Sequence, residues 1–348
     1  MDNTYLFHGN AAVGGAVERL AANAGWQRVD SLADADVVVT YCTNQQALED
    51  AYFDEGGFVQ TARSGTLMID LSPSTPGFAR ELSAVALVSE LHPVEAPIAV
   101  LDPTWEDAFS RPDNLICFVA GEEDDVAAAK PFLQAIAGEV LEEGPLGSAQ
   151  LARAARTVQQ VGTLVATAES EALCHAVRRA AGAGNLAEDA PHPTSESAQA
   201  YLEAIVEKRF EGTYTLEMMM GELAAALTAA DDADLILPQT EACMHLLELL
   251  AVIGGSDKAP IALSLVYGEE EACAEQGLDW TRAEHFYGEQ EDGAQGVLHD
   301  HGRDHDHDHG DGDGDDYDEY GSYDDYDGYT GYDNDGIYHG GYGSYSPN

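Results

Sequence analysis

The residues Gly9-Asn10-Ala11-Ala12-Val13-Gly14 have the glycine spacing of a phosphate-binding turn. They follow an apolar run and precede a helical pattern, which is the context in which a G-x-G-x-x-G loop binds the pyrophosphate of a dinucleotide. Gly9 would make the tight turn, and Gly14 would let the helix pack close to the strand. Ala11 occupies the middle position and places a methyl group where the pyrophosphate must approach. The loop therefore predicts weak binding of NAD or NADP, with an ordinary strand–helix turn as the alternative.

Histidine and aspartate alternate near the carboxyl end, in the run HDHGRDHDHDHG at residues 299–310. Neutral imidazole nitrogens suit Ni²⁺, Zn²⁺, Cu²⁺ and Co²⁺, with aspartate as an auxiliary ligand. The run predicts loose binding of a divalent transition metal by His299, His301, His305, His307 and His309. A hydrophilic tail without a metal role is the alternative.

Several further motifs occur in a fixed order along the chain: IDLSPSTP (69–76), VEAPIA (94–99), VAGEEDDVAAAKPFLQAI (119–136), GPLGSAQLAR (144–153) and AESEAL (168–173). Together they resemble the β-hydroxyacid dehydrogenase family, which includes the 3-hydroxyisobutyrate dehydrogenases and is allied to 6-phosphogluconate dehydrogenase. The resemblance covers about residues 1–260. It implies an N-terminal Rossmann domain, a helical C-terminal domain, NAD(P) as cofactor, and dimers or tetramers built through a long helix.

The positions that this resemblance marks as catalytic carry other residues here. The family's acid/base lysine corresponds to Arg153, and the family's asparagine corresponds to Thr157. A lysine can be desolvated until it exchanges a proton near neutral pH, whereas a guanidinium stays protonated. Arg153 and Thr157 are therefore the candidate catalytic residues, with Arg153 expected to position a substrate and another group or water to move the proton.

Two other family motifs are altered as well. In the cofactor-facing motif Asp70, Ser72 and Pro76 remain, so Ser72 is a candidate cofactor contact, but Pro73 replaces the threonine. The substrate loop is changed over its whole length, at Glu95-Ala96-Pro97-Ile98-Ala99-Val100-Leu101, and the family's K-D-L becomes Gly221-Glu222-Leu223. Two hypotheses stay open. The chain is a diverged NAD(P)-dependent oxidoreductase for a small carbonyl or imine, or a non-catalytic relative that serves as a ligand-binding, scaffold or metal-handling protein.

The elements that position these residues alternate between strand and helix in the first part of the chain. Apolar runs predict strands at 4–9, 35–42, 65–72 and 115–121, and a strand or loop at 95–101. Helical spacing predicts helices at 14–25, 47–53, 76–87 and 122–138. This alternation predicts an α/β fold with a Rossmann-like, doubly wound domain at residues 1–143. The segment that should read the adenosine ribose is short, and WQRVD leaves only a remnant strand with Arg28 or Asp30 at its end.

The pattern changes to all-helical at residue 144. A proline-free run predicts one long helix over 148–181, followed by helices at 195–210, 215–233 and 238–255. These form an all-helical substrate and dimerisation domain at 144–288, and we expect a homodimer that buries the apolar stripe of the long helix. Residues 289–348 are rich in Gly, Asp, Tyr and His, and we expect them to be disordered.

Charge and cysteine content restrict the partners. The 348 residues include 15 Lys+Arg against 64 Asp+Glu, a formal net charge of −49, which argues against nucleic acid or an anionic membrane as partner. The five cysteines show no CxxC spacing, which indicates a reducing compartment. Without an apolar run of membrane-spanning length or a signal segment, the sequence predicts a cytoplasmic protein with a small-molecule ligand.

Overall fold

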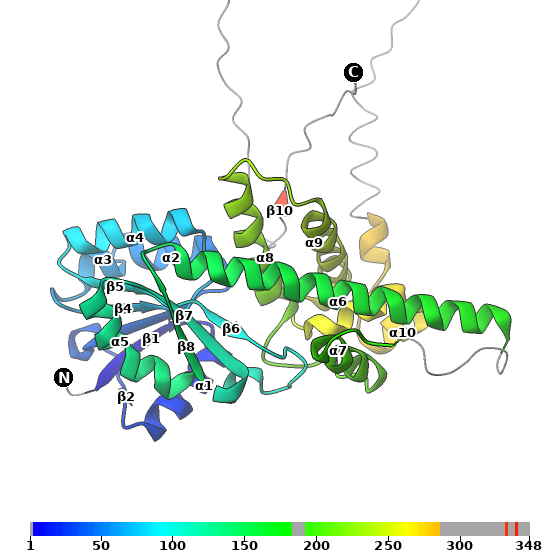
Figure 1. Cartoon of the computed structure of the whole chain (residues 1–348), viewed down its shortest axis with the longest axis horizontal. Helices are drawn as coiled ribbons and strands as arrows, with labels where there is room; N and C mark the ends of the chain where they lie inside the picture. Colours follow the sequence, from blue (N-terminus) through cyan, green and yellow to red (C-terminus); the bar gives the residue numbers. More distant parts are fainter. Residues whose placement is uncertain (1–2, 183–191, 286–330, 333–337, 340–348) are drawn as a thin grey trace, which may run out of the picture. The chain divides into compact units, whose positions relative to one another are not determined.

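The computed structural model describes residues 3–182, 192–285, 331–332 and 338–339 (Figure 1). Met1–Phe286 form one compact unit, and Tyr287–Asn348 form a second. In the second unit the described residues are the strands β9 (Gly331–Tyr332) and β10 (Tyr338–His339), which pair antiparallel. The five histidines predicted to bind metal, and the rest of the tail predicted to be disordered, lie outside the described residues.

The first part of the chain builds one sheet with the order β2-β1-β3-β4-β5-β7-β6, and β8 also pairs with β7. Its strands are β1 (Thr4–Gly9), β2 (Gln27–Arg28), β3 (Val37–Tyr41), β4 (Leu67–Asp70), β5 (His92–Glu95), β6 (Ile98–Val100), β7 (Leu115–Gly121) and β8 (Glu139–Gly144). All pairings are parallel except those of β7 with β5 and β6. The segment expected as a single strand or loop at 95–101 therefore includes the end of β5 and the whole of β6. Ala96 and Pro97 separate these two strands, which both pair antiparallel with β7 in one register.

Helices flank this sheet on both faces (Figure 1). They are α1 (Ala11–Asn23), α2 (Gln45–Phe53), α3 (Phe58–Thr61), α4 (Pro76–Val88) and α5 (Glu123–Ile136). Alternate residues of β3 enter different cores: Val39 packs in the cluster that contains Phe132 of α5, whereas Val38 packs in the cluster that contains Leu48 of α2. Because successive strand residues point to opposite faces, this division confirms the doubly wound α/β prediction.

The connection between β2 and β3 is reduced to a single turn of 3₁₀ helix, Leu32–Asp34. β2 is two residues long and pairs with Thr4 and Tyr5 at the start of β1. The remnant strand predicted from WQRVD is therefore present. No α-helix separates it from β3, so one layer of the usual nucleotide-binding unit is shortened at this edge of the sheet.

The helical region begins with α6 (Ser148–Ala181), a helix of 34 residues that matches the predicted span. Around it pack α7 (Glu196–Val206), α8 (Leu216–Asp231), α9 (Pro238–Leu250) and the 3₁₀ segment Pro260–Tyr267. The short helix α10 (Glu270–Glu275) packs on that 3₁₀ segment. Figure 1 shows α6 running from the sheet through the helical region to a projecting end. Among the described residues no single helix has both the length and the apolar composition of a membrane span; Pro238–Gly255 and Pro260–Tyr267, bent by 88°, meet both only as a pair.

Candidate functional site

The turn between β1 and α1 has the geometry that its glycines require. Gly9 has φ +120°, and an added Cβ would lie 1.9 Å from the carbonyl oxygen of Tyr41, so only glycine fits. A Cβ on Gly14 would lie 2.8 Å from the ring of Phe7, which shows that α1 packs closely on β1. Both features have the form that a dinucleotide-binding turn needs.

The amino end of α1 is capped by its own sequence. Asn10 precedes the helix, and its side-chain oxygen accepts hydrogen bonds from the amides of Ala12 (3.0 Å) and Val13 (3.2 Å). Ala11 and Ala12 are exposed, whereas Val13 is buried in the core. A pyrophosphate would approach the exposed Ala11 and Ala12, and it would compete with the Asn10 side chain for two of the amides. The residues present therefore fit the phosphate portion of a dinucleotide, with Asn10 required to move.

The part of the sheet that would bind the adenosine, at the short strand β2, offers few free side chains. Arg28 of β2 forms an ion pair with Glu18 of α1 at 2.9 Å, so its guanidinium is already engaged. Asp30 is exposed beyond the end of β2. Arg28 thus ends β2, where a ribose-reading side chain belongs, but Glu18 already binds its guanidinium.

The two candidate catalytic residues meet inside the protein. Arg153 and Thr157 lie one turn apart on α6 and are 2% and 1% exposed. The Arg153 Nη1 donates to the hydroxyl of Thr157, and Nε donates to the Ile98 carbonyl oxygen at 2.9 Å. The third nitrogen, Nη2, forms an ion pair with Glu222 of α8, which is 3% exposed. All three guanidinium nitrogens therefore have partners within the chain.

A tyrosine completes this cluster. The hydroxyl of Tyr214 donates to the Glu222 carboxylate at 2.5 Å. Burial raises the pKa of Tyr214 well above its usual value, and the neighbouring Glu222 raises it further. Burial alone would lower the pKa of Arg153, but the adjacent Glu222 carboxylate raises it, and the net shift is upward. Arg153 thus holds its proton firmly, as expected for an arginine that binds rather than transfers a proton.

Ser72 lies in the interior, at the carboxyl end of β4. It is fully buried, its hydroxyl accepts from the Cys42 amide at 2.9 Å, and its own amide donates to Asp70 at 3.0 Å. The side chain of Gln150 on α6 donates to the Ser72 carbonyl oxygen at 2.9 Å. Ser72 therefore joins the sheet to α6 in this structure, and its predicted contact with a cofactor stays a prediction.

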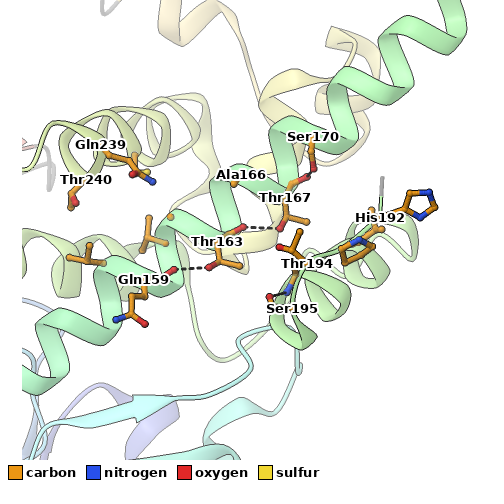
Figure 2. A pocket seen from close by; sticks show the side chains of 17 residues that line it. Gln159, Thr163, Ala166, Thr167, Ser170, His192, Thr194, Ser195, Gln239 and Thr240 are labelled. Atoms are coloured by element: carbon orange, nitrogen blue, oxygen red, sulfur yellow. Dashed lines mark hydrogen bonds between the residues drawn. The ribbon is translucent and has the colours of Figure 1, made fainter. Parts of the chain in front are cut away.

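A cavity of about 760 Å³ lies elsewhere, among α6, α7 and α9. Figure 2 shows Gln159, Thr163 and Thr167 along α6, with Gln239 and Thr240 of α9 opposite. Among the described residues its lining includes no aspartate, glutamate, lysine or arginine. None of the predicted site residues lines it, and the described residues hold no cluster of three or more metal-ligating side chains.

Comparison with known proteins agrees with this geometry. The family described as the NAD binding domain of 6-phosphogluconate dehydrogenase matches residues 10–144. The chain is 26% identical over 262 residues to the NAD-dependent L-serine dehydrogenase of Pseudomonas aeruginosa, covering 71% of this chain and 84% of that protein. Human mitochondrial 3-hydroxyisobutyrate dehydrogenase is 28% identical over 152 residues, which are 42% of this chain and 44% of that protein. The chain is thus a distant homologue of the β-hydroxyacid dehydrogenases, and its residues 10–144 match their NAD-binding domain.

Solved structures of this family share the fold. The 3-hydroxyisobutyrate dehydrogenase of Salmonella typhimurium superposes with a TM-score of 0.61 at 14% identity, over 76% of this chain and 99% of that one. The Mycobacterium tuberculosis 3-hydroxyisobutyrate dehydrogenase, solved with L-serine, gives 0.58 at 20% identity, over 77% of this chain and all of that one. Both confirm the Rossmann-like sheet followed by a helical domain on a long helix.

Sequence reasoning missed three members of the site of this β-hydroxyacid dehydrogenase relative. Tyr41, Tyr214 and Glu222 are all buried around Arg153. The sequence shows Glu222 only as part of the altered motif Gly221-Glu222-Leu223. The signal that was available is its place on the apolar face of a helix, where an acidic residue needs a cation.

Proposed function

We propose that the chain is an NAD(P)-dependent oxidoreductase of the β-hydroxyacid dehydrogenase family that acts on a small carbonyl or imine compound rather than on a 3-hydroxy acid. The part of this proposal that concerns the substrate rests on the environment of Arg153. A cation that binds a carboxylate substrate needs free N–H groups, and the three nitrogens of Arg153 are engaged by Ile98, Thr157 and Glu222.

The cofactor half is supported by the turn at Gly9 and by the family match over residues 10–144. The amides at the start of α1, at Ala11 and Ala12, would hold the phosphates, and the bound nicotinamide would supply or accept a hydride. Because Ala11 adds a methyl group and β2 is short, we expect weaker binding than the fold usually gives, with little preference between NAD and NADP.

Calorimetric titration with NADH and NADPH tests the cofactor proposal. Ala11→Gly should tighten binding, because it removes the methyl group from the phosphate approach. Gly15→Ala is the matched control: it changes one methyl group on the same helix, and nothing lies within 4 Å of the added Cβ. A measurable affinity that Ala11→Gly leaves unchanged would contradict the assignment of this turn to the phosphates.

The substrate proposal is tested by following NADPH oxidation with small aldehydes, ketones and cyclic imines. Turnover of at least one of these, with none for 3-hydroxyisobutyrate in the reverse direction, is the expected result. Turnover of hydroxy acids alone would contradict the role given to the Arg153 cluster.

A second candidate is a non-catalytic protein that binds an uncharged ligand. The cavity among α6, α7 and α9 favours it. About 760 Å³ lined by amides, hydroxyls, apolar groups, the imidazole of His192 and the thiol of Cys243, without a carboxylate, lysine or arginine among the described lining residues, suits a neutral molecule. Ligand-observed NMR against a set of neutral compounds tests this function. Ala166 lines the cavity, so the larger side chain of Ala166→Trp should fill it and abolish any binding. Ala155→Trp, on the exposed face of the same helix, should leave binding unchanged.

A further inference from the structure

The carboxyl end of β3 is covered by aromatic side chains. In a Rossmann-type sheet the reactive part of a dinucleotide lies at the carboxyl ends of the parallel strands. Here Tyr41, the last residue of β3, meets Phe109 edge to face with ring centroids 5.7 Å apart, and Phe109 meets Tyr214 at 6.0 Å. All three side chains are at most 2% exposed. Protein groups thus occupy the space over this strand end.

The backbone of α8 closes on the same place. A Cβ on Gly221 would lie 1.9 Å from the carbonyl oxygen of Thr43, in the loop that follows β3. The hydroxyl of Thr43 also donates to Glu217 of α8 at 3.3 Å. Gly221 therefore allows α8 to pack directly against the loop at the carboxyl end of β3.

The ion pair between Arg153 and Glu222 ties this arrangement together. Arg153 of α6 holds the Ile98 carbonyl oxygen of β6 and the carboxylate of Glu222 on α8. One side chain thus joins the sheet, the long helix and the helix that covers the strand end. Both charges are buried, so moving α8 away from α6 would leave each charge without its partner, which is strongly unfavourable.

We propose that the Arg153–Glu222 ion pair is a latch that holds α8 over the carboxyl end of β3 and excludes the reactive half of a dinucleotide. The described structure is the closed, autoinhibited state, and α8 must separate from the loop at Thr43 before the site can be filled. This inference rests on the proposed function for its ligand. The latch itself is a property of the chain and has its own readout.

A double variant, Arg153→Met with Glu222→Leu, tests the latch. It replaces the pair by apolar groups of similar size and leaves no lone buried charge, so the fold is expected to persist. Hydrogen exchange of the α8 amides around Gly221 should become about tenfold faster under native conditions, while exchange in α5 stays unchanged. NADPH affinity should rise by a similar factor, because apparent affinity scales with the population of the open state.

Two controls keep the outcomes separate. Tyr214→Phe removes only the hydrogen bond to Glu222 and should give a smaller acceleration in α8, which supplies a test if the double variant does not fold. Glu269→Gln breaks the exposed pair with Arg179 and should change nothing in α8. Faster exchange without NADPH binding to either protein would support the latch and refute the cofactor proposal. Unchanged exchange in α8 of both the double variant and Tyr214→Phe would overturn the latch.

Discussion

Asp70 and Glu95 lie directly opposite each other on the parallel strands β4 and β5, and both carboxyl groups are buried. Asp70 accepts hydrogen bonds from the Thr40 hydroxyl at 2.8 Å and from the Ser72 amide at 3.0 Å. Burial raises the pKa of Asp70 to about 6, against these hydrogen bonds. Burial also raises the pKa of Glu95, and the nearby Asp70 adds to that rise.

Asp70 therefore makes the stability of the fold depend on pH. Its pKa is about 6 in the folded protein and 3.8 ordinarily, so the folded state binds more protons between these values. The free energy of unfolding then falls as pH rises from about 4 to about 6, by at most roughly 3 kcal/mol from this group. Asp70→Asn keeps an acceptor oxygen and removes the titration. In urea unfolding, the free energy of unfolding of this variant should fall less between about pH 4 and pH 6 than that of the parent. The variant should be more stable than the parent at pH 7.5.

The matched control for this pH dependence is Asp113→Asn, since Asp113 is an exposed carboxylate of the same domain. It should leave the pH profile as it is. A profile for Asp70→Asn that parallels the parent's would show that Asp70 titrates normally in the fold.

Glu95 also caps the amino end of α6, and its removal should destabilise the protein. Its two oxygens accept from the amides of Gly147 at 2.6 Å and Gln150 at 2.5 Å. Glu95→Ala leaves both buried amides without an acceptor, at a cost of about 2–4 kcal/mol in the free energy of unfolding. Glu122 precedes α5 without a side-chain capping bond, so Glu122→Ala should stay within about 0.5 kcal/mol of the parent. Equal losses in the two variants would contradict the capping role.

Gly221→Ala should destabilise the protein although it replaces a helical glycine by the best helix former. The added Cβ would meet the Thr43 carbonyl oxygen, so α8 must shift from the sheet edge. We expect a loss of at least about 1–3 kcal/mol, the usual cost of overpacking. Gly15→Ala, where the space is open, should instead gain about 0.5–1 kcal/mol. Thermal unfolding of both variants measures the difference, and a stabilised Gly221→Ala would mean that α8 does not rest on Thr43.

The sequence predicted the helices and strands far better than it predicted the side-chain contacts between them. The valines at 37–39 and the proline-free run at 148–181 carry strong local patterns, and both elements were found where expected. The partner of Arg153 depends on how α6 crosses α8, and 64 acidic residues offer too many choices for local pattern to decide. The two-residue strand β2 and the strand β8 have no clear apolar run or alternation in their sequences, because their burial is set by neighbouring elements.

Arg153→Lys alone should not produce a 3-hydroxyisobutyrate dehydrogenase. A lysine in this place would still face the Glu222 carboxylate, and the substrate loop around Ala99 lacks the hydroxyl that the family resemblance expects. An ammonium beside a buried carboxylate keeps its proton and shuttles poorly. We expect no NAD(P)-linked oxidation of 3-hydroxyisobutyrate, glycerate or 6-phosphogluconate by the parent or the variant in a spectrophotometric assay. Robust turnover by the parent would show that the proton-transfer residue lies elsewhere.

We propose that a second copy of the chain packs on α6. Leu151, Leu173 and Val177 of this helix are 60%, 65% and 48% exposed, an apolar surface that a helix in water normally covers. Sedimentation at micromolar concentration should show a dimer, and Leu173→Glu with Val177→Glu should shift it to monomer through charge repulsion. Ile236→Glu, at another exposed apolar position, is the control and should leave the dimer intact. A monomeric parent would refute this interface.

The 34 residues of α6 span about 51 Å. Glu95 and Arg153 join its amino-terminal part to the sheet, whereas Glu169 and Arg179 contact Tyr267 and Glu269 of the helical region. If α6 tilts as a rigid rod about its amino end, the helices packed on it move with it, by a distance that grows with their separation from that end. A tilt of about 5° at the Glu95 cap would carry Ala181 through roughly 4 Å, given the rise of 1.5 Å per residue. A small change in how the sheet holds the amino end of α6 would therefore move the helical region relative to the sheet, most of all near Ala181.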